Sequence, residues 1–229
     1  AAAVAVELVH SATLLHDDVV DMSDLRRGQP TARLVYGNAG SVFAGDWLLV
    51  YPFEIVARAA EEGAFTPDVA ARVCATIARG VCTSGIVAGQ VLDLEAESRD
   101  VTAAELRRIH ELKTAALMEA CARVGAAIAG APAQLSDTAA RSARALGLCF
   151  QVVDDILDVV GDAAVLGKPT GADSENAKST YVSLHGLDLA RNMAAQLAAE
   201  ARDALDALPD SEWLLRGRQL IDYVVGRSS

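Results

Sequence analysis

The sequence has few aromatic residues and no regular alternation of apolar and polar side chains. Aromatic residues make up only 4% of the 229 residues, and neither they nor the β-branched residues cluster into alternating runs, which argues against a β-sheet protein. Alanine is abundant, and alanine has the highest helix propensity. We therefore expect an all-α fold.

Long apolar runs and a leader sequence are also absent. No window holds the ~18 unbroken apolar residues that a membrane-spanning helix needs, and no basic region precedes an apolar core and a cleavage site at the N-terminus. We therefore expect a cytoplasmic protein without stable membrane insertion. The first residues, Ala1 to Leu8, resemble the middle of a helix without a cap, so we expect helices of a longer protein to precede them.

Paired cysteines and excess positive charge are missing as well. The four cysteines are separated widely, with no CxxC spacing: Cys74, Cys82, Cys121 and Cys149. We expect them to be reduced thiols in the core. The net charge of −11 disfavours nucleic acid as a partner. It does not exclude an anionic substrate, because local basic clusters can offset the average charge.

The composition indicates a globular protein, since 52% of the residues are hydrophobic and 22% are charged. We find no repeat of solenoid length and no interdomain linker, so we expect one domain, residues 1–229, built as a helical bundle. Helices are expected at 1–21, 41–60, 66–95, 102–130, 136–160, 178–208 and 211–226. The segment 23–40 contains several breakers and is expected to be a loop.

Three carboxylates interrupt the apolar run 146–160: Asp154, Asp155 and Asp158. On a helix, residues four apart share a face, and Asp155 lies about 100° round from Asp154. Like charges in apolar surroundings are costly unless a cation neutralises them. The same pattern occurs earlier, at Asp17, Asp18 and Asp21. We interpret the two clusters as facing metal-binding walls of one active site.

The six carboxylates are not accompanied by a ligand set of His or Cys, which favours Mg²⁺ over Zn²⁺. Magnesium usually takes one or two protein carboxylates and completes its shell with water and phosphate oxygens. A phosphate-bearing substrate is therefore expected between the clusters. Basic residues near the clusters could bind it: Arg26, Arg27, Lys113, Lys168 and Lys178.

Together these motifs resemble those of the trans-isoprenyl diphosphate synthases, also called polyprenyl synthetases. LHDDVVD at 15–21 with DLRRG at 24–28 is similar to that family's first aspartate-rich motif, and FQVVDDILD at 150–158 to the second. Gly89–Gln90 with Asp93, Lys113–Thr114, Gly167–Lys168 and Lys178–Thr180 match further positions. The resemblance implies an isoprenoid synthase fold, an all-α bundle around a deep central cavity, usually in a homodimer.

The resemblance also implies an activity: head-to-tail condensation of isopentenyl diphosphate with an allylic diphosphate. By position, the six aspartates would bind Mg²⁺ on the allylic diphosphate. Cationic side chains would grip that diphosphate: Arg26, Lys113, Lys168 and Lys178. Arg27 and His10 would help to bind isopentenyl diphosphate. Thr114 and Gln151 would lie beside the reacting carbons, so the resemblance makes Lys113, Thr114 and Gln151 the catalytic residues.

Two departures from the family pattern stand out. The upstream motif Gly-Gly-Lys-x-x-Arg, which binds isopentenyl diphosphate in the family, is absent, and Ala177 replaces the usual glycine before Lys178. The chain-length position five residues before the first aspartate of its motif is Ala12, followed by Thr13. Both are small, which predicts a product of twenty carbons or more. Against this, the stretch 178–184 looks more like that of short-chain members.

Three other functions stay open. A non-catalytic regulatory subunit of a heteromeric prenyl synthase would explain the absent upstream motif. A farnesyl diphosphate synthase would make a shorter product. A terpene cyclase would have the same fold and would need no isopentenyl diphosphate. His16, next to Asp17, is either a hydrogen-bond donor to that carboxylate or a buried histidine satisfied elsewhere.

Overall fold

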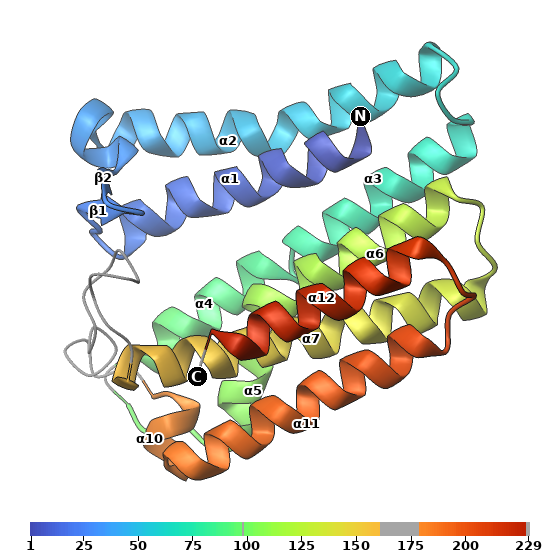
Figure 1. The fold of residues 1–229 in the computed structure, drawn as a ribbon. Helices are drawn as coiled ribbons and strands as arrows, with labels where there is room; N and C mark the ends of the chain where they lie inside the picture. Colours follow the sequence, from blue (N-terminus) through green and yellow to red (C-terminus); the bar gives the residue numbers. More distant parts are fainter. Residues whose placement is uncertain (98, 161–178, 228–229) are drawn as a thin grey trace. The chain divides into compact units, whose positions relative to one another are not determined.

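The computed structural model describes residues 1–97, 99–160 and 179–227 (Figure 1). Apart from one short hairpin, the regular structure in these ranges is helical, and the expected all-α fold is confirmed. The Cα positions divide into two compact units. In the described ranges, the first unit holds residues 1–77 and the second holds 78–160 and 179–227. The single domain and the central cavity stay predictions.

The first unit is built on two long helices that lie side by side, α1 (Ala2–Val20) and α2 (Ala32–Glu61) (Figure 1). Between them, β1 (Leu25–Arg26) and β2 (Gln29–Pro30) form an antiparallel hairpin. Four buried residues of α1 recur every three or four positions, as on the face of a packed helix: Ala2, Ala5, Val9 and Ala12. Small residues allow α2 to approach closely: a Cβ on Gly45 would lie 2.3 Å from Nε2 of His16.

The second unit is centred on the long helix α7 (Ala133–Val160), which packs against α6 (Ala116–Ile128) and α11 (Leu187–Asp206). The remaining helices are α4 (Ile86–Ala96), α5 (Ala103–His110), α10 (Tyr181–His185) and α12 (Glu212–Gly226). A π-helical segment, η1 (Glu111–Ala115), joins α5 to α6 without a break. Helix α3 (Pro67–Val81) spans the boundary between the two units.

Several expected boundaries were wrong for one reason, which is that a single glycine can either bend or break a helix. The segment 23–40 is not all loop, because α2 begins at Ala32 and continues past one non-helical residue, Gly37, at φ 78°. The helix expected at 178–208 is interrupted at Gly186, which has φ 81°. The spacing of Thr102 and Glu105 in the sequence predicts a capping box at the start of the helix expected at 102–130, and the structure confirms it, with Glu105 N 3.2 Å from Thr102 Oγ1.

One apolar helical stretch and two of the four cysteines differ from what the sequence predicted. By length and composition alone, one helical stretch of the described residues, 67–96, is apolar enough to span a membrane, with a mean hydropathy of 1.2. One such stretch is weak evidence, and the single helix expected at 66–95 is wrong, because the chain is interrupted between α3 and α4. Of the four cysteines, only Cys149 is buried. The expected core location is wrong for Cys82, which follows the end of α3, and for Cys121 on α6, since both are exposed.

Candidate functional site

The first acidic cluster lies at the end of α1. Asp18 is only 2% exposed, and its Oδ1 accepts a hydrogen bond from Nε of Arg26 at 2.8 Å and forms an ion pair with Nη2 at 2.8 Å. Asp17 is half-buried on the same turn, and Asp21 is exposed at the C-cap. Arg26 reaches Asp18 because β1 turns back beside the end of the helix. The positive charge that follows the motif in sequence is thus also next to it in space.

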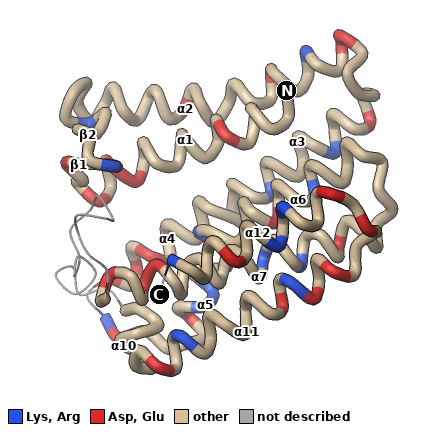
Figure 2. Tube along the Cα trace, viewed as in Figure 1, with Lys and Arg blue, Asp and Glu red and all other residues tan. Residues whose placement is uncertain are grey.

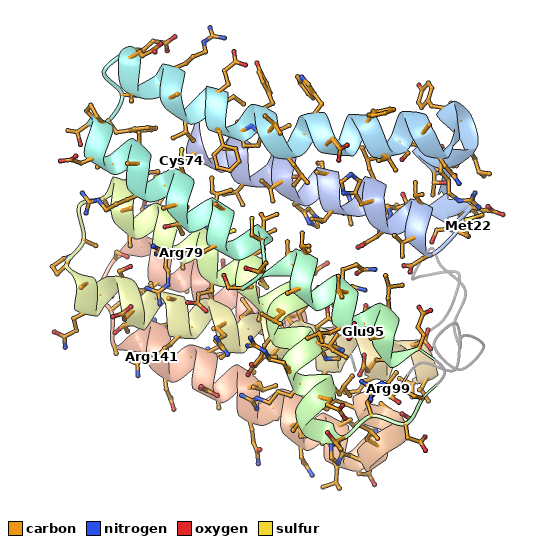
Figure 3. All side chains as sticks on the ribbon, turned by 180° about the vertical axis from the view of Figure 1, so that it is seen from behind. Met22, Cys74, Arg79, Glu95, Arg99 and Arg141 are labelled. Carbon is orange, nitrogen blue, oxygen red and sulfur yellow. The ribbon has the colours of Figure 1, made fainter. Side chains whose placement is uncertain are left out.

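The backbone after Asp21 is fastened by Arg33, which the sequence analysis did not single out. Arg33 donates to the carbonyl oxygens of Met22 at 2.6 Å and Ser23 at 2.9 Å, and it pairs with Asp24 at 2.6 Å. Figure 3 labels Met22 at this turn, where its φ is 51°. A lone arginine at the second residue of a helix carries no sequence signal for such a role. Its contacts fix the direction in which the chain leaves the cluster.

The hairpin explains the different surroundings of the two neighbouring arginines. Arg27 and Gly28, at the tip, both have positive φ, 53° and 74°, as a type I′ turn requires. Arg26 lies before the tip and contacts Asp18, whereas Arg27 is exposed. The predicted roles of Arg26 on one diphosphate and Arg27 on another are therefore compatible with this local geometry, and they stay predictions.

The histidines of α1 lie on different parts of the helix. Nε2 of His16 is 3.2 Å from the carbonyl oxygen of Val42 and 3.4 Å from Oδ1 of Asp46, both on α2. His16 therefore ties α1 to α2, which favours the reading of a histidine satisfied away from the cluster. His10 is half-buried, and its carbonyl oxygen accepts the hydroxyl of Thr13 at 2.8 Å.

The second acidic cluster lies near the C-terminal end of α7, where Figure 2 shows acidic residues together. Asp155 and Asp158 are each 6% exposed, and the side chain of Asp154 is 32% exposed. Oδ2 of Asp155 accepts a hydrogen bond from the backbone N–H of Tyr181 at 2.7 Å. That N–H belongs to the first turn of α10, so Asp155 fastens this helix to α7.

The two clusters share a pattern that the sequence did not reveal. In each, the middle carboxylate is buried and held by the protein: Asp18 by Arg26 and Asp155 by Tyr181. The outer carboxylates are four residues apart and so lie on one helical face: Asp17 with Asp21, and Asp154 with Asp158. Asp158 is as buried as Asp155, so the feature that the clusters share is a held middle carboxylate between two carboxylates on a common helical face.

This donor set suits magnesium. Within the described residues, no group of three or more His, Cys, Asp or Glu is placed to hold a metal by itself. Magnesium needs no such group, because it usually binds through one or two carboxylates plus substrate phosphates and water. The two clusters belong to different units, so their expected meeting across one cavity stays a prediction.

The predicted catalytic residues meet in the second unit. Nζ of Lys113 pairs with Oδ2 of Asp93 at 2.6 Å, and the hydroxyl of Thr114 donates to Oε1 of Gln151 at 2.5 Å. Lys113 and Thr114 both lie on η1, and π-helical segments often occur at functional sites. Three segments far apart in sequence, α4, η1 and α7, therefore supply one group of polar side chains.

Buried polar atoms surround this group. His110 is 8% exposed, and Gln90 lies three residues before Asp93 on α4. Within the described residues, Nδ1 of His110 and both amide atoms of Gln90 are buried without a hydrogen-bond partner. Such atoms are rare in folded proteins and call for a partner. A bound polar ligand is one way to satisfy them.

Burial controls the protonation of His110, to which sequence reasoning gave no role. Desolvation lowers the pKa of His110 from 6.5 to about 4, and the nearby negative charge of Asp93 opposes this only in part. The imidazole is therefore neutral near pH 7. Its ring packs at a tilt on Tyr181, with 5.3 Å between the ring centroids, next to the residue that fastens Asp155.

Arg227, which the sequence analysis did not single out, lies near the second acidic cluster. The guanidinium of Arg227, just after α12, lies 4.9 Å from the ring centroid of Phe150. Its Nη2 is 3.9 Å from Oδ1 of Asp154. No sequence signal marked Arg227, because the contact joins segments far apart in the chain.

The structure describes two of the four remaining predicted residues. Lys168 and Lys178 lie outside the described residues. Ala12 is fully buried in the first unit, and the hydroxyl of Thr13 is bonded within α1. The predicted effect of these two residues on product length stays a prediction.

Comparison with known proteins gives the same family from sequence and from structure. The family model for polyprenyl synthetase matches residues 1–208. The chain is 41% identical to the large subunit 1 of a chloroplastic heterodimeric geranylgeranyl pyrophosphate synthase of Arabidopsis thaliana, a match that covers all of this chain and 62% of that protein. It is 40% identical to farnesyl diphosphate synthase of Escherichia coli (strain K12), with 100% and 77% covered.

A solved structure agrees with these relatives. It is the geranyltransferase from Helicobacter pylori, complexed with magnesium and isoprenyl diphosphate. The TM-score is 0.84 and the identity 32%, over 98% of this chain and 73% of that one. The chain spans about three fifths of the length of the Arabidopsis relative. The resemblance inferred from the motifs is confirmed: the chain belongs to the polyprenyl synthetase family.

Proposed function

We propose that this protein is a Mg²⁺-dependent prenyltransferase. It condenses isopentenyl diphosphate head-to-tail with an allylic diphosphate to give a trans-polyprenyl diphosphate, and inorganic diphosphate and one proton are released. The observation that carries the proposal is the repeated aspartate arrangement, in which each cluster has a buried, fastened carboxylate between two that share a face. Membership of the family and the presence of magnesium and isoprenyl diphosphate in the Helicobacter pylori neighbour support it.

Charge neutralisation is the first requirement of this reaction. When bound, Mg²⁺ draws negative charge away from the leaving diphosphate. In the proposal, the outer pairs Asp17/Asp21 and Asp154/Asp158 hold the metal. Asp18 and Asp155 keep those pairs in place, since their own oxygens are engaged by Arg26 and Tyr181. Buried anchors of this kind hold the other ligands in the geometry that binding needs.

The cationic side chains supply the second part of the neutralisation. Nζ of Lys113 lies 2.6 Å from Oδ2 of Asp93. This ion pair fixes the ammonium group beside η1. In the proposal, Lys113, Arg26, Lys168 and Lys178 bind the allylic diphosphate, while Arg27 and His10 bind isopentenyl diphosphate. Fixed cations next to a leaving anion lower the barrier because they need no reorganisation during the reaction.

The carbocation left after ionisation needs oriented dipoles and a dry surface. The Thr114 hydroxyl donates to Gln151 at 2.5 Å, which aims the electron-rich side of the hydroxyl oxygen away from Gln151. We propose that this pair lies beside the reacting carbons. On α4, Val87, Val91 and Leu94 form an exposed apolar stripe next to Gln90 and Asp93. A surface of this kind suits a prenyl tail, which gains free energy when it leaves water.

A turnover assay on the purified protein tests the proposal. The protein is incubated with isopentenyl diphosphate, Mg²⁺ and each of several allylic primers, and the products are sized. Turnover that requires isopentenyl diphosphate is expected. Product formed without isopentenyl diphosphate would indicate a cyclase, and binding without turnover would indicate a regulatory subunit.

A pair of variants of α7 connects the assay to the site. Asp154→Asn removes a charge from the proposed metal face and is expected to lower turnover by about 10²-fold or more. Asp137→Asn makes the same change near the start of the same helix, where the exposed Asp137 pairs with the half-buried Arg123. It is expected to leave turnover unchanged. Equal effects of both substitutions would contradict the assignment of the second cluster.

We further propose a product of twenty carbons or more, because Ala12 and Thr13 are small. The relatives include both farnesyl and geranylgeranyl synthases, so the family alone leaves the length open. Ala12 is fully buried, whereas Ala3 on the same helix is exposed. Ala12→Phe should shorten the product, and Ala3→Phe should not. An unchanged product length in a folded Ala12→Phe variant would refute the proposal.

We also propose that the protein forms a homodimer in the cytoplasm. Helix α2 supports the dimer, because Phe43, Trp47 and Val50 are 73%, 58% and 68% exposed. These residues lie within about 60° of each other around the helix. A contiguous apolar stripe of this kind marks an interaction surface. The Arabidopsis relative, in contrast, is named chloroplastic.

A further inference from the structure

Arg227 is held beside the second acidic cluster by two contacts to one face of α7. Phe150 and Asp154 are four residues apart and therefore share that face. The guanidinium carbon is 4.9 Å from the Phe150 ring centroid, and Nη2 is 3.9 Å from Oδ1 of Asp154. The Arg227 side chain is 27% exposed, so the contact is neither fully buried nor fully solvated. The guanidinium thus lies along the turn that carries Gln151 and Asp154.

The contact with Phe150 and the contact with Asp154 hold Arg227 in different ways. The face of an arginine guanidinium is attracted to the electrons of an aromatic ring. Its N–H groups then point outward in the plane of the guanidinium. At 3.9 Å, the approach to Asp154 is longer than the 2.7–3.2 Å of a hydrogen bond. Phe150 therefore positions the charge near Asp154 without a direct hydrogen bond between this pair of atoms.

We propose that Arg227 is a placeholder cation for the second acidic cluster. Before a metal ion binds, its charge offsets that of Asp154. Once metal and substrate are bound, the same N–H groups donate to a diphosphate oxygen at this end of α7. This inference rests on the proposed function, because it assumes that Asp154 binds the metal.

The placeholder role predicts effects of opposite sign. Without a diphosphate, Arg227 repels the incoming metal ion and competes with it for Asp154. With a diphosphate present, Arg227 adds a cation to the bound anion and tightens the complex. A purely structural role would weaken both complexes or neither. The sign of the change therefore separates the two explanations.

The test measures Mn²⁺ binding to the full chain by electron paramagnetic resonance, with and without saturating inorganic pyrophosphate. Arg227→Gln is compared with Arg216→Gln. Arg216 is an exposed arginine of α12 whose side chain bonds to Gln219 on its own helix. In Arg227→Gln, the Kd for Mn²⁺ alone should fall by about 3- to 10-fold, and the Kd for Mn²⁺ with pyrophosphate should rise by a similar factor. Arg216→Gln should match the wild type in both measurements.

Two arms identify the source of the diphosphate. The KM for the allylic diphosphate and the KM for isopentenyl diphosphate are measured for the same variants. The substrate whose KM rises in Arg227→Gln is the one whose diphosphate Arg227 binds. The inference is overturned if Arg227→Gln follows Arg216→Gln, or if both Mn²⁺ complexes weaken together. If the wild type binds no Mn²⁺ and shows no turnover, the proposed function itself fails. Normal binding and turnover in the wild type with unchanged variants contradict the Arg227 role alone.

Discussion

At the scale of single residues, the buried His110 links stability to pH. Its pKa is lowered from 6.5 to about 4 because burial penalises the charged imidazolium. Between these values the unfolded chain holds a proton that the folded chain does not. Stability from this group is therefore fully present above pH 6.5 and is lost as the pH falls toward 4. A neutral imidazole packed on Tyr181 is thus part of the folded state at neutral pH.

We predict that the free energy of unfolding falls by about 2 kcal/mol between pH 7 and pH 5 on account of His110 alone. Urea unfolding of the wild type and of His110→Gln at both values isolates this share, because the variant has no imidazole to protonate. His185→Gln is the matched control on α10, since no comparable burial affects that side chain. An identical pH dependence in wild type and His110→Gln would contradict the prediction.

The aspartate clusters show what a sequence reveals about single residues and what it cannot reveal. Spacing and apolar surroundings were enough to predict two carboxylate clusters on helices. The division of labour within each cluster could not be predicted, because it depends on partners from other segments. Asp18 is fastened by an arginine on a hairpin, and Asp155 by a backbone N–H of α10. Arg227 was missed for the same reason, since its neighbours Phe150 and Asp154 are distant in sequence.

At the scale of elements, η1 is positioned by glycines on two neighbouring helices. A Cβ on Gly89 of α4 would lie 2.3 Å from the backbone nitrogen of Lys113, and a Cβ on Gly147 of α7 would lie 2.7 Å from Cα of Ala115. Backbone atoms cannot move aside as a flexible side chain can. The two glycines therefore allow α4 and α7 to approach the segment that carries Lys113 and Thr114.

We predict that Gly89→Ala destabilises the protein by about 1–3 kcal/mol, because the added methyl group forces α4 away from η1. The shift should also move Asp93 from Lys113 and raise the KM for the allylic substrate. Gly125→Ala in α6 is the control, since a Cβ there meets nothing within 4 Å. It should be neutral or stabilise the helix by up to about 1 kcal/mol. Chemical denaturation with steady-state kinetics measures both effects, and equal stability of the two variants would refute the explanation.

Helix boundaries were harder to predict than helices, and glycine is again the reason. Gly37 and Gly186 both adopt positive φ, and from sequence both are only possible breakers. At Gly37 the chain resumes a helix in the same element, whereas Gly186 separates α10 from α11. The outcome depends on what the flanking turns pack against. Short-range sequence signals succeeded where the interaction is itself short-range, as in the capping box of Thr102 and Glu105.

At the scale of the whole molecule, the first unit carries an apolar face that is exposed in the described part of the chain. On α2, Phe43, Trp47 and Val50 are all more than half exposed, and Trp47 stacks on Tyr51 at 4.5 Å between ring centroids. The stacking orders a large aromatic surface in water. Covering it with the same helix of a second copy would remove that surface from both chains, as expected for a two-fold symmetric dimer.

We predict that the wild-type protein has about twice the mass of one 23.9 kDa chain in solution, and that the double variant Phe43→Glu, Trp47→Glu is monomeric. Two carboxylates placed on each copy of a self-complementary face would meet their own symmetry mates, so repulsion adds to the loss of apolar contact. Trp213→Glu is the control, because Trp213 is 72% exposed on α12 and belongs to the other unit. Light scattering after size-exclusion chromatography measures all three masses. A monomeric wild type would indicate that the α2 face binds a different protein. A double variant that stays dimeric would show that the interface lies elsewhere.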